Sequence, residues 1–296
     1  HEQLAVTRQR SDGWVSVNLG IPPSITTQLL QAKKVVASEM DAETLSVNPE
    51  GFRQQIISSV IAGAKGFLVR TFRPLDIQDA SDSAQIASLN LIQEELQLWG
   101  PWIIAGQAIQ SPSISDADWI SSAWSIEDSM LILAKNAAEG TQVVPKGTMQ
   151  KPLEFVFPVV KQGQSVFRLT TGKLERLEIQ PGANGMKWPV HKPAAIESFL
   201  VSSSPIVIQF VQRHLSTGLD RRAADQLEVV TYEMALAGSI LNARFHERNA
   251  VSELSLNHVR RLNQAQQLID SSVRAMRAKQ LLASINLTLE AQDAVQ

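Results

Sequence analysis

With 296 residues, of which 44% are hydrophobic and 19% charged, the chain can form real hydrophobic cores and is not disordered as a whole. Its formal net charge of -2 argues against a dominant role in binding nucleic acid or a membrane surface. The absence of cysteine excludes disulfides, thiol catalysis and thiolate metal sites. No apolar run approaches the roughly 20 residues of a membrane-spanning helix. The sequence opens at His1 rather than Met, so we expect a processed product or a piece of a longer chain.

Residues 1–110 alternate predicted strands and helices. The apolar run WVSVNLGI, which begins at Trp14 and is closed by two prolines, predicts a buried strand. Asn48 is a suitable N-cap and Pro49 suits the first position of a helix that carries one apolar stripe. The apolar segment GFLVRTF, from Gly66, predicts a second strand.

A second helix is expected from about Ser83 to Leu98, and WIIAG, from Trp102, is expected to be a short strand or a closing segment. Strands that alternate with helices predict a parallel sheet. Two or three such units make only a partial, barrel-like region, because a closed (β/α) barrel needs about 250 residues. Residues 1–110 therefore predict a partial α/β region of two or three βα units.

Residues 111–215 are expected to form an antiparallel β-sandwich, because many short apolar runs are separated by turn signals. These runs are MLILAKN, LEFVFPVV, SVFRLTT, KLERLEI, AAIESFLV and PIVIQFVQ. Residues 216–296 repeat apolar residues at three-four spacing and predict antiparallel helices, as a hairpin or a three-helix segment. The fold class is therefore mixed: an α/β part, an all-β part and an α-helical tail.

Candidate binding residues follow the two predicted strands of the parallel sheet, where function collects in such sheets. Asn18 ends the first strand and can hydrogen-bond a sugar hydroxyl. Arg70 and Arg73 follow the second strand and can clamp a carboxylate or phosphate. In the alternative interpretation, these arginines pair with Asp76 and Asp79 and only shape the loop.

Acidic candidates are fewer. Glycoside hydrolysis needs two carboxyl groups on either side of one bond, and neither predicted parallel strand ends in a glutamate. Glu39 and Asp41, in the loop after the first strand, are the nearest acids and are either catalytic or substrate-binding residues or only solvated surface groups. The five histidines show no tight ligand spacing, so neither a metal site nor any cofactor is expected.

The tryptophans and a basic segment near the C-terminus each allow a structural and a functional interpretation. The six tryptophans either stack on sugar rings or, as is more common, pack in the core. Residues 258–279 lean basic, which either docks an acidic protein partner or is a solvated helix face.

The segments VNPEGFRQQIISSVIAGAKGFLVRTFRPLD and LNLIQEELQLWGPWIIAG resemble the closing units of glycoside-hydrolase-like (β/α) barrels, which pass into a β-sandwich that begins with a phrase like SMLILAKN. The whole layout is similar to the C-terminal part of large, uncharacterised bacterial proteins of this type, in which a helical segment follows the sandwich. The resemblance covers about 60 residues in motif and most of the chain in layout. It implies an exported or cell-envelope location.

Families of this kind often place a catalytic glutamate at the end of a late barrel strand, where this sequence has Arg70 to Arg73. The resemblance therefore implies the C-terminal portion of a glycoside-hydrolase-like protein that contributes carbohydrate contacts, with its catalytic acids upstream of this chain. The alternative is a non-catalytic module that binds carbohydrate or protein, or serves as a scaffold.

Overall fold

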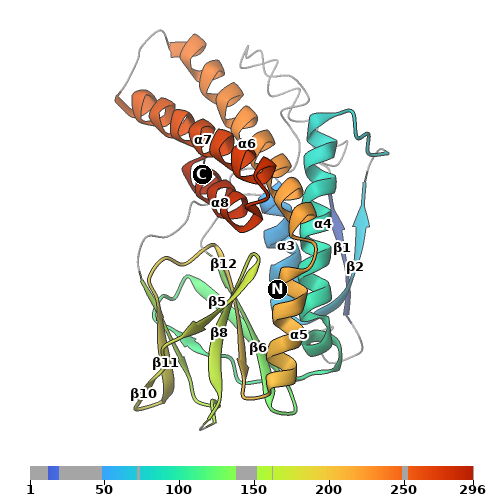
Figure 1. The fold of residues 1–296 in the computed structure, drawn as a ribbon, viewed down its shortest axis with the longest axis vertical. Coiled ribbons are helices and arrows are strands. Elements are labelled where there is room, and N and C mark those ends of the chain that lie inside the picture. The colour runs from blue at the N-terminus through green and yellow to red at the C-terminus, as the bar shows by residue number, and fades with distance from the viewer. Residues whose placement is uncertain are drawn as a thin grey trace.

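The structure is a computed structural model that describes residues 13–19, 49–71, 74–137, 152–161, 163–248 and 253–295. It combines antiparallel sheets, one parallel strand pair and long helices, so the predicted mixed α/β content and the C-terminal helices are confirmed. Figure 1 shows the antiparallel strands gathered at one end of the molecule and the helices α6, α7 and α8 at the other. The described residues form no closed barrel.

Two antiparallel sheets face each other across a core. The larger has the order β3-β5-β6-β12-β8-β9 and the smaller has the order β10-β11-β7-β4. The strands of the larger sheet are β3 (Gln107–Ile109), β5 (Trp119–Ile126), β6 (Ser129–Asn136), β8 (Ser165–Thr170), β9 (Lys173–Leu177) and β12 (Ile196–Ser202). Those of the smaller sheet are β4 (Ser113–Ile114), β7 (Leu153–Phe157), β10 (Gln180–Gly182) and β11 (Gly185–Val190).

The core between these sheets is aromatic. Trp188 stacks on Phe155 with ring centroids 5.8 Å apart, and Phe199 meets both rings edge-on. All three side chains are fully buried. Because Phe155 and Trp188 lie on the smaller sheet and Phe199 on the larger, this cluster holds the two sheets together.

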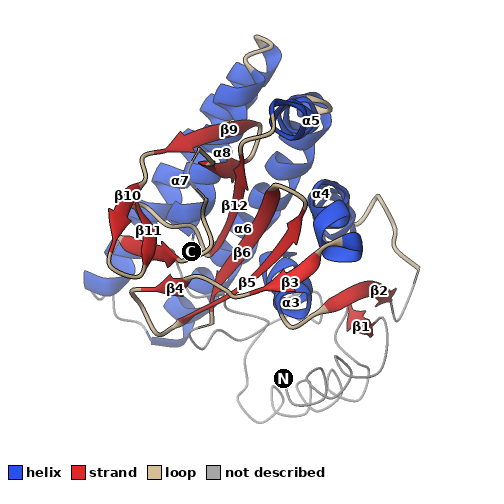
Figure 2. Cartoon of the chain, turned by 90° about the horizontal axis from the view of Figure 1, so that it is seen from below, coloured by secondary structure: helices blue, strands red, loops and turns tan. Residues whose placement is uncertain are grey.

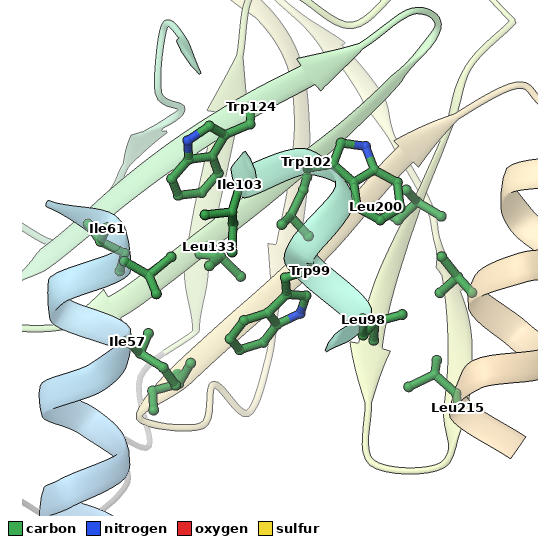
Figure 3. Close-up of a cluster of buried hydrophobic side chains, with 14 residues drawn as sticks. Ile57, Ile61, Leu98, Trp99, Trp102, Ile103, Trp124, Leu133, Leu200 and Leu215 are labelled. Carbon is green, nitrogen blue, oxygen red and sulfur yellow. The ribbon is translucent and has the colours of Figure 1, made fainter. Parts of the chain in front are cut away.

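The other face of the larger sheet is covered by helices, as Figure 2 shows for α4 and α5. They are α3 (Pro49–Ile61), α4 (Ala80–Gly100) with the π-helical turn η2 (Pro101–Ala105), and α5 (Pro205–Ser216). In Figure 3, Ile57, Trp99 and Leu215 reach from these helices toward Leu133 and Leu200 of the sheet. One hydrophobic core therefore joins residues on both sides of the boundary expected near residue 110.

The parallel pair of strands lies beside this assembly. β1 (Gly13–Asn18) and β2 (Ala64–Arg70) are parallel, as predicted, and α3 connects them along the chain. Their inward side chains form a separate core with α3 and α4, made up of Val17, Leu19, Phe52, Ile56 and Ile92 with partly buried neighbours.

The structure departs from one local prediction and decides between the alternatives of another. The run PIVIQFVQ is the first part of α5 rather than a strand. A short apolar run does not separate helix from strand by itself; here Ser204 caps the helix, Pro205 occupies its first turn, and Val211 and Leu215 are buried at a spacing of four. The segment WIIAG, expected to be a short strand or a closing segment, is not a strand. It forms η2, because Pro101 lacks the N–H that would continue the α-helical ladder while Trp102 and Ile103 stay in the core.

The C-terminal helices are α6 (Leu219–Arg248), α7 (Glu253–Arg277) and α8 (Leu281–Val295). They pack on one another through Val230, Ile269 and Ala291. A buried hydroxyl cluster also joins α7 to α8: Ser272 Oγ lies 2.9 Å from Ser284 Oγ and 2.7 Å from Thr288 Oγ1. α6 also packs against α4, which ties the three-helix segment to the rest of the fold.

Ser204→Ala tests the start of α5. The Ser204 hydroxyl accepts the Val207 N–H at the N-terminus of this helix. Its removal is expected to lower the free energy of unfolding by about 1 kcal/mol. Urea unfolding followed by circular dichroism measures this, with the exposed neighbour Ser203→Ala as control. Equal stability of the two variants would contradict the cap.

Candidate functional site

The carboxyl ends of β1 and β2 bring two of the predicted site residues together. Asn18 and Arg70 are register partners in the parallel pair, and the Leu19 N–H donates to the Arg70 carbonyl at 2.9 Å. Both side chains are exposed. The predicted site residues Arg73, Glu39 and Asp41 lie outside the described residues. We call the pair Asn18 and Arg70 the rim.

The β1–β2 pair has two different faces, because side chains alternate along a strand. Val15, Val17 and Leu19 of β1 point to the helices, whereas Trp14 lies on the opposite face with Asn18. Trp14 is 73% exposed and lies on Gly66, where a Cβ atom would be 2.7 Å from the indole ring. Leu68, on the same face of β2, is 51% exposed. This face therefore runs from apolar residues at the start of the strands to polar residues at their ends.

The acids after β2 hold the loop in shape through the backbone. Asp79 Oδ1 accepts the Asp82 N–H at 3.0 Å and so caps α4, and Asp76 Oδ1 accepts the Gln78 N–H at 2.9 Å. The buried Asp82 carboxylate accepts the Asp76 N–H at 2.8 Å. These acids therefore shape the loop by accepting hydrogen bonds from backbone N–H groups. The alternative interpretation, in which Arg70 and Arg73 pair with them, stays a prediction, because Arg73 lies outside the described residues.

A second candidate site is a cavity that sequence reasoning did not find. It has a volume of about 410 Å³ and lies between α3 and α4 on one side, strands β8, β9 and β12 on another, and α6 and α8 on the third. A volume of this size falls within the range of small-molecule sites, roughly 300–1,000 Å³.

Three arginine–glutamate pairs line the cavity. Arg53 donates to both carboxylate oxygens of Glu95, at 2.6 and 3.0 Å. Arg168 does the same to Glu197, at 2.6 and 2.7 Å. Two-pronged pairs of this kind fix both side chains in one geometry.

The third pair joins Arg222 of α6 to Glu94 of α4. Arg222 is 6% exposed, and it also donates to the carbonyls of Leu215 at 2.8 Å and His214 at 3.1 Å, at the end of α5. One guanidinium therefore links three helices.

Glu50 is one of the acids of the cavity whose pKa is shifted by its surroundings. Burial raises the pKa of its carboxyl above the usual 4.5, and the neighbouring Glu95 charge adds to this, while Arg53 acts in the opposite direction. Arg53 Nη1 is 3.4 Å from Glu50, farther than its contacts with Glu95. The Glu50 proton is therefore held more tightly in the folded chain than in the unfolded chain.

No local pattern in the sequence signals this cavity. The paired residues are 42, 29 and 128 positions apart for Arg53–Glu95, Arg168–Glu197 and Arg222–Glu94. The signals that exist are weak: two consecutive glutamates, Glu94 and Glu95, in a helix whose only other charged residue is Asp82, and a glutamate in the apolar strand AAIESFLV. Charges in such positions need partners, but the sequence does not identify them.

The other candidates have structural contacts. Five of the six tryptophans are at most 6% exposed, as a core role predicts, and Trp14 is the exception. On the basic helix α7, Arg261 donates to the Asp293 carbonyl and Arg274 to the Ser271 hydroxyl. Among the residues that the structure describes, no group of three or more metal-ligating side chains converges. None of the described helices is long and apolar enough to cross a membrane.

Neither the protein-family models nor the curated proteins give a significant match to this sequence.

Arg222→Met tests the three-helix link. The change leaves the Glu94 carboxylate and two carbonyls without their donor, so the free energy of unfolding is expected to fall by about 3–5 kcal/mol. Its neighbour provides the control, because the Arg221 side chain is 61% exposed in its pair with Asp225. Arg221→Met is expected to cost less than about 1 kcal/mol in urea unfolding. A similar loss in the free energy of unfolding for both variants would contradict the role of Arg222 as a buried link between α4, α5 and α6.

Glu50→Gln tests the raised pKa. The folded state binds this proton more tightly, so the free energy of unfolding falls as the pH rises from 4.5 through the raised pKa of the folded state. The amide does not titrate, so the variant is expected to lose this part of the pH dependence and to gain stability at about pH 7 relative to the wild type. Urea unfolding across this window measures both slopes, and identical slopes would contradict the assignment.

Proposed function

We propose that this chain is the C-terminal portion of a glycoside-hydrolase-like protein. In this proposal, β1 and β2 are neighbouring strands of a (β/α) barrel, Asn18 and Arg70 contact carbohydrate at its mouth, and the catalytic carboxylates belong to strands outside this chain. The observation that carries the proposal is the graded face of β1 and β2, with Trp14 at one end and the rim at the other.

The physical argument starts from parallel sheets, which are normally covered on both faces. Helices α3 and α4 cover one face of β1 and β2, while Trp14 and Leu68 stay exposed on the other. In a (β/α) barrel the inner face is filled by layers of bulky side chains, and the polar residues that act on substrate lie at the carboxyl ends of the strands. Trp14 and Leu68 suit such inner layers, and Asn18 and Arg70 suit the mouth.

The chemistry of the rim also suits a sugar. The Asn18 amide both donates and accepts hydrogen bonds, and the Arg70 guanidinium offers several donors in one plane. A ring with neighbouring hydroxyl groups can meet both side chains at once. Neither side chain is a carboxylic acid that could protonate a leaving group, so the rim supports binding rather than acid–base catalysis.

Arg70→Ala tests the proposal. Loss of charged hydrogen bonds to sugar hydroxyls is expected to weaken the binding of a soluble glycan about tenfold or more, measured by titration calorimetry against a panel of neutral and acidic polysaccharides. Arg260→Ala, at an exposed position on α7, is the matched control and should bind as the wild type does.

The wild-type chain, incubated with chromogenic glycosides, is expected to release no product, because the proposal assigns the catalytic carboxylic acids to strands outside this chain. Turnover by this chain would contradict that part of the proposal. Unchanged glycan affinity in Arg70→Ala would contradict the rim.

A further inference from the structure

The cavity between the helices and the larger sheet has the properties of a ligand site that is separate from the rim. Its volume is about 410 Å³, and its walls come from segments that are far apart in the sequence. The lining mixes charged pairs with hydroxyl and amide side chains, such as Ser88, Thr170 and Gln226, and with leucines.

The arginines in the lining are compensated within the protein. Arg53, Arg168 and Arg222 each bind a glutamate within the protein. Lys173 and Glu175 lie two residues apart on β9, at exposed positions of the lining. The lining also holds the carboxyls of Glu50 and Asp293, whose pKa values are raised by burial, so it disfavours an anion. An uncharged polar molecule needs no counter-ion and can donate to the hydroxyl oxygens of Ser88 and Thr170, whose own hydrogen atoms bind the protein.

One buried donor in the lining has no partner. Trp99 is 2% exposed, and no acceptor in the described structure binds its Nε1–H group. Figure 3 shows this nitrogen on the side of the ring that faces Leu98, which also lines the cavity. A buried N–H group without an acceptor is unfavourable, so an oxygen atom of a ligand would gain from occupying this place.

We propose that this cavity binds a neutral polyhydroxylated molecule, a sugar of one or two rings, with a hydroxyl oxygen that accepts the Trp99 Nε1–H. Hydroxyl groups both donate and accept, as the mixed lining requires. The leucines of the lining suit the C–H faces of a sugar ring. This inference does not rest on the glycan contacts proposed for the rim.

The test follows the indole N–H signals of the full chain by NMR after ¹⁵N labelling of tryptophan. The probes are glucose, N-acetylglucosamine and cellobiose, with glucuronate and free arginine as charged probes. A neutral sugar is expected to shift the Trp99 signal in a saturable way. Trp119 and Trp188 serve as internal controls, because their Nε1 atoms are also buried without a partner but lie in the core between the two sheets. Trp99→Phe assigns the signal.

Asn286→Phe is the second variant, because Asn286 is exposed and lines the cavity from α8. The larger side chain is expected to abolish the Trp99 shift, whereas Arg70→Ala at the rim should leave it unchanged. The proposal is overturned if no neutral sugar moves the Trp99 signal, if only the charged probes do, or if the shift persists in Asn286→Phe. Loss of the shift in Arg70→Ala would place the binding at the rim and overturn it as well.

Discussion

The buried guanidinium of Arg222 fixes three helices relative to one another. It binds Glu94 on α4 and the last carbonyls of α5, while its own backbone belongs to α6. The carbonyl end of a helix carries partial negative charge, so a cation there is favourable, and a buried cation without such partners would be costly. The end of α5 must therefore stay next to α4. That position closes the hydrophobic core over the sheet and leaves the cavity beside it.

The larger sheet shows why charged residues occur in the middle of this fold. Every residue of β12 is buried, because one face of this strand meets the smaller sheet and the other meets the helices. Glu197 lies within this strand and is 2% exposed, so its carboxylate needs donors. Arg168 on the neighbouring strand and the Ala194 N–H, at 2.6 Å, supply them. By strand alternation the side chains of Glu197 and Arg168 both lie on the face of the sheet that carries Phe199, and both line the cavity.

The two candidate sites arise from different causes. At the rim, Asn18 and Arg70 are adjacent because parallel strands in register bring their carboxyl ends to one edge. No local feature such as strand register brings the residues of the cavity together, because its three ion pairs join distant segments. The rim is the type of site that strand order predicts, whereas the cavity is the type that only tertiary packing creates. This difference explains why the first was predicted and the second was not.

The sequence by itself determined the elements whose pattern is local. Pro49 and the apolar stripe after it placed α3, and the runs WVSVN and GFLVR placed β1 and β2, whose parallel pairing followed from the helix between them. The three-four spacing likewise placed the C-terminal helices. Tertiary structure decided the rest. PIVIQFVQ is helical because Val207, Ile208 and Val211 on one side of it cover a sheet. Trp99 and Glu94 line a cavity because Arg222 holds α4, α5 and α6 together. Burial and ion pairing depend on partners far along the chain, and a local pattern carries no record of which partner a side chain will meet.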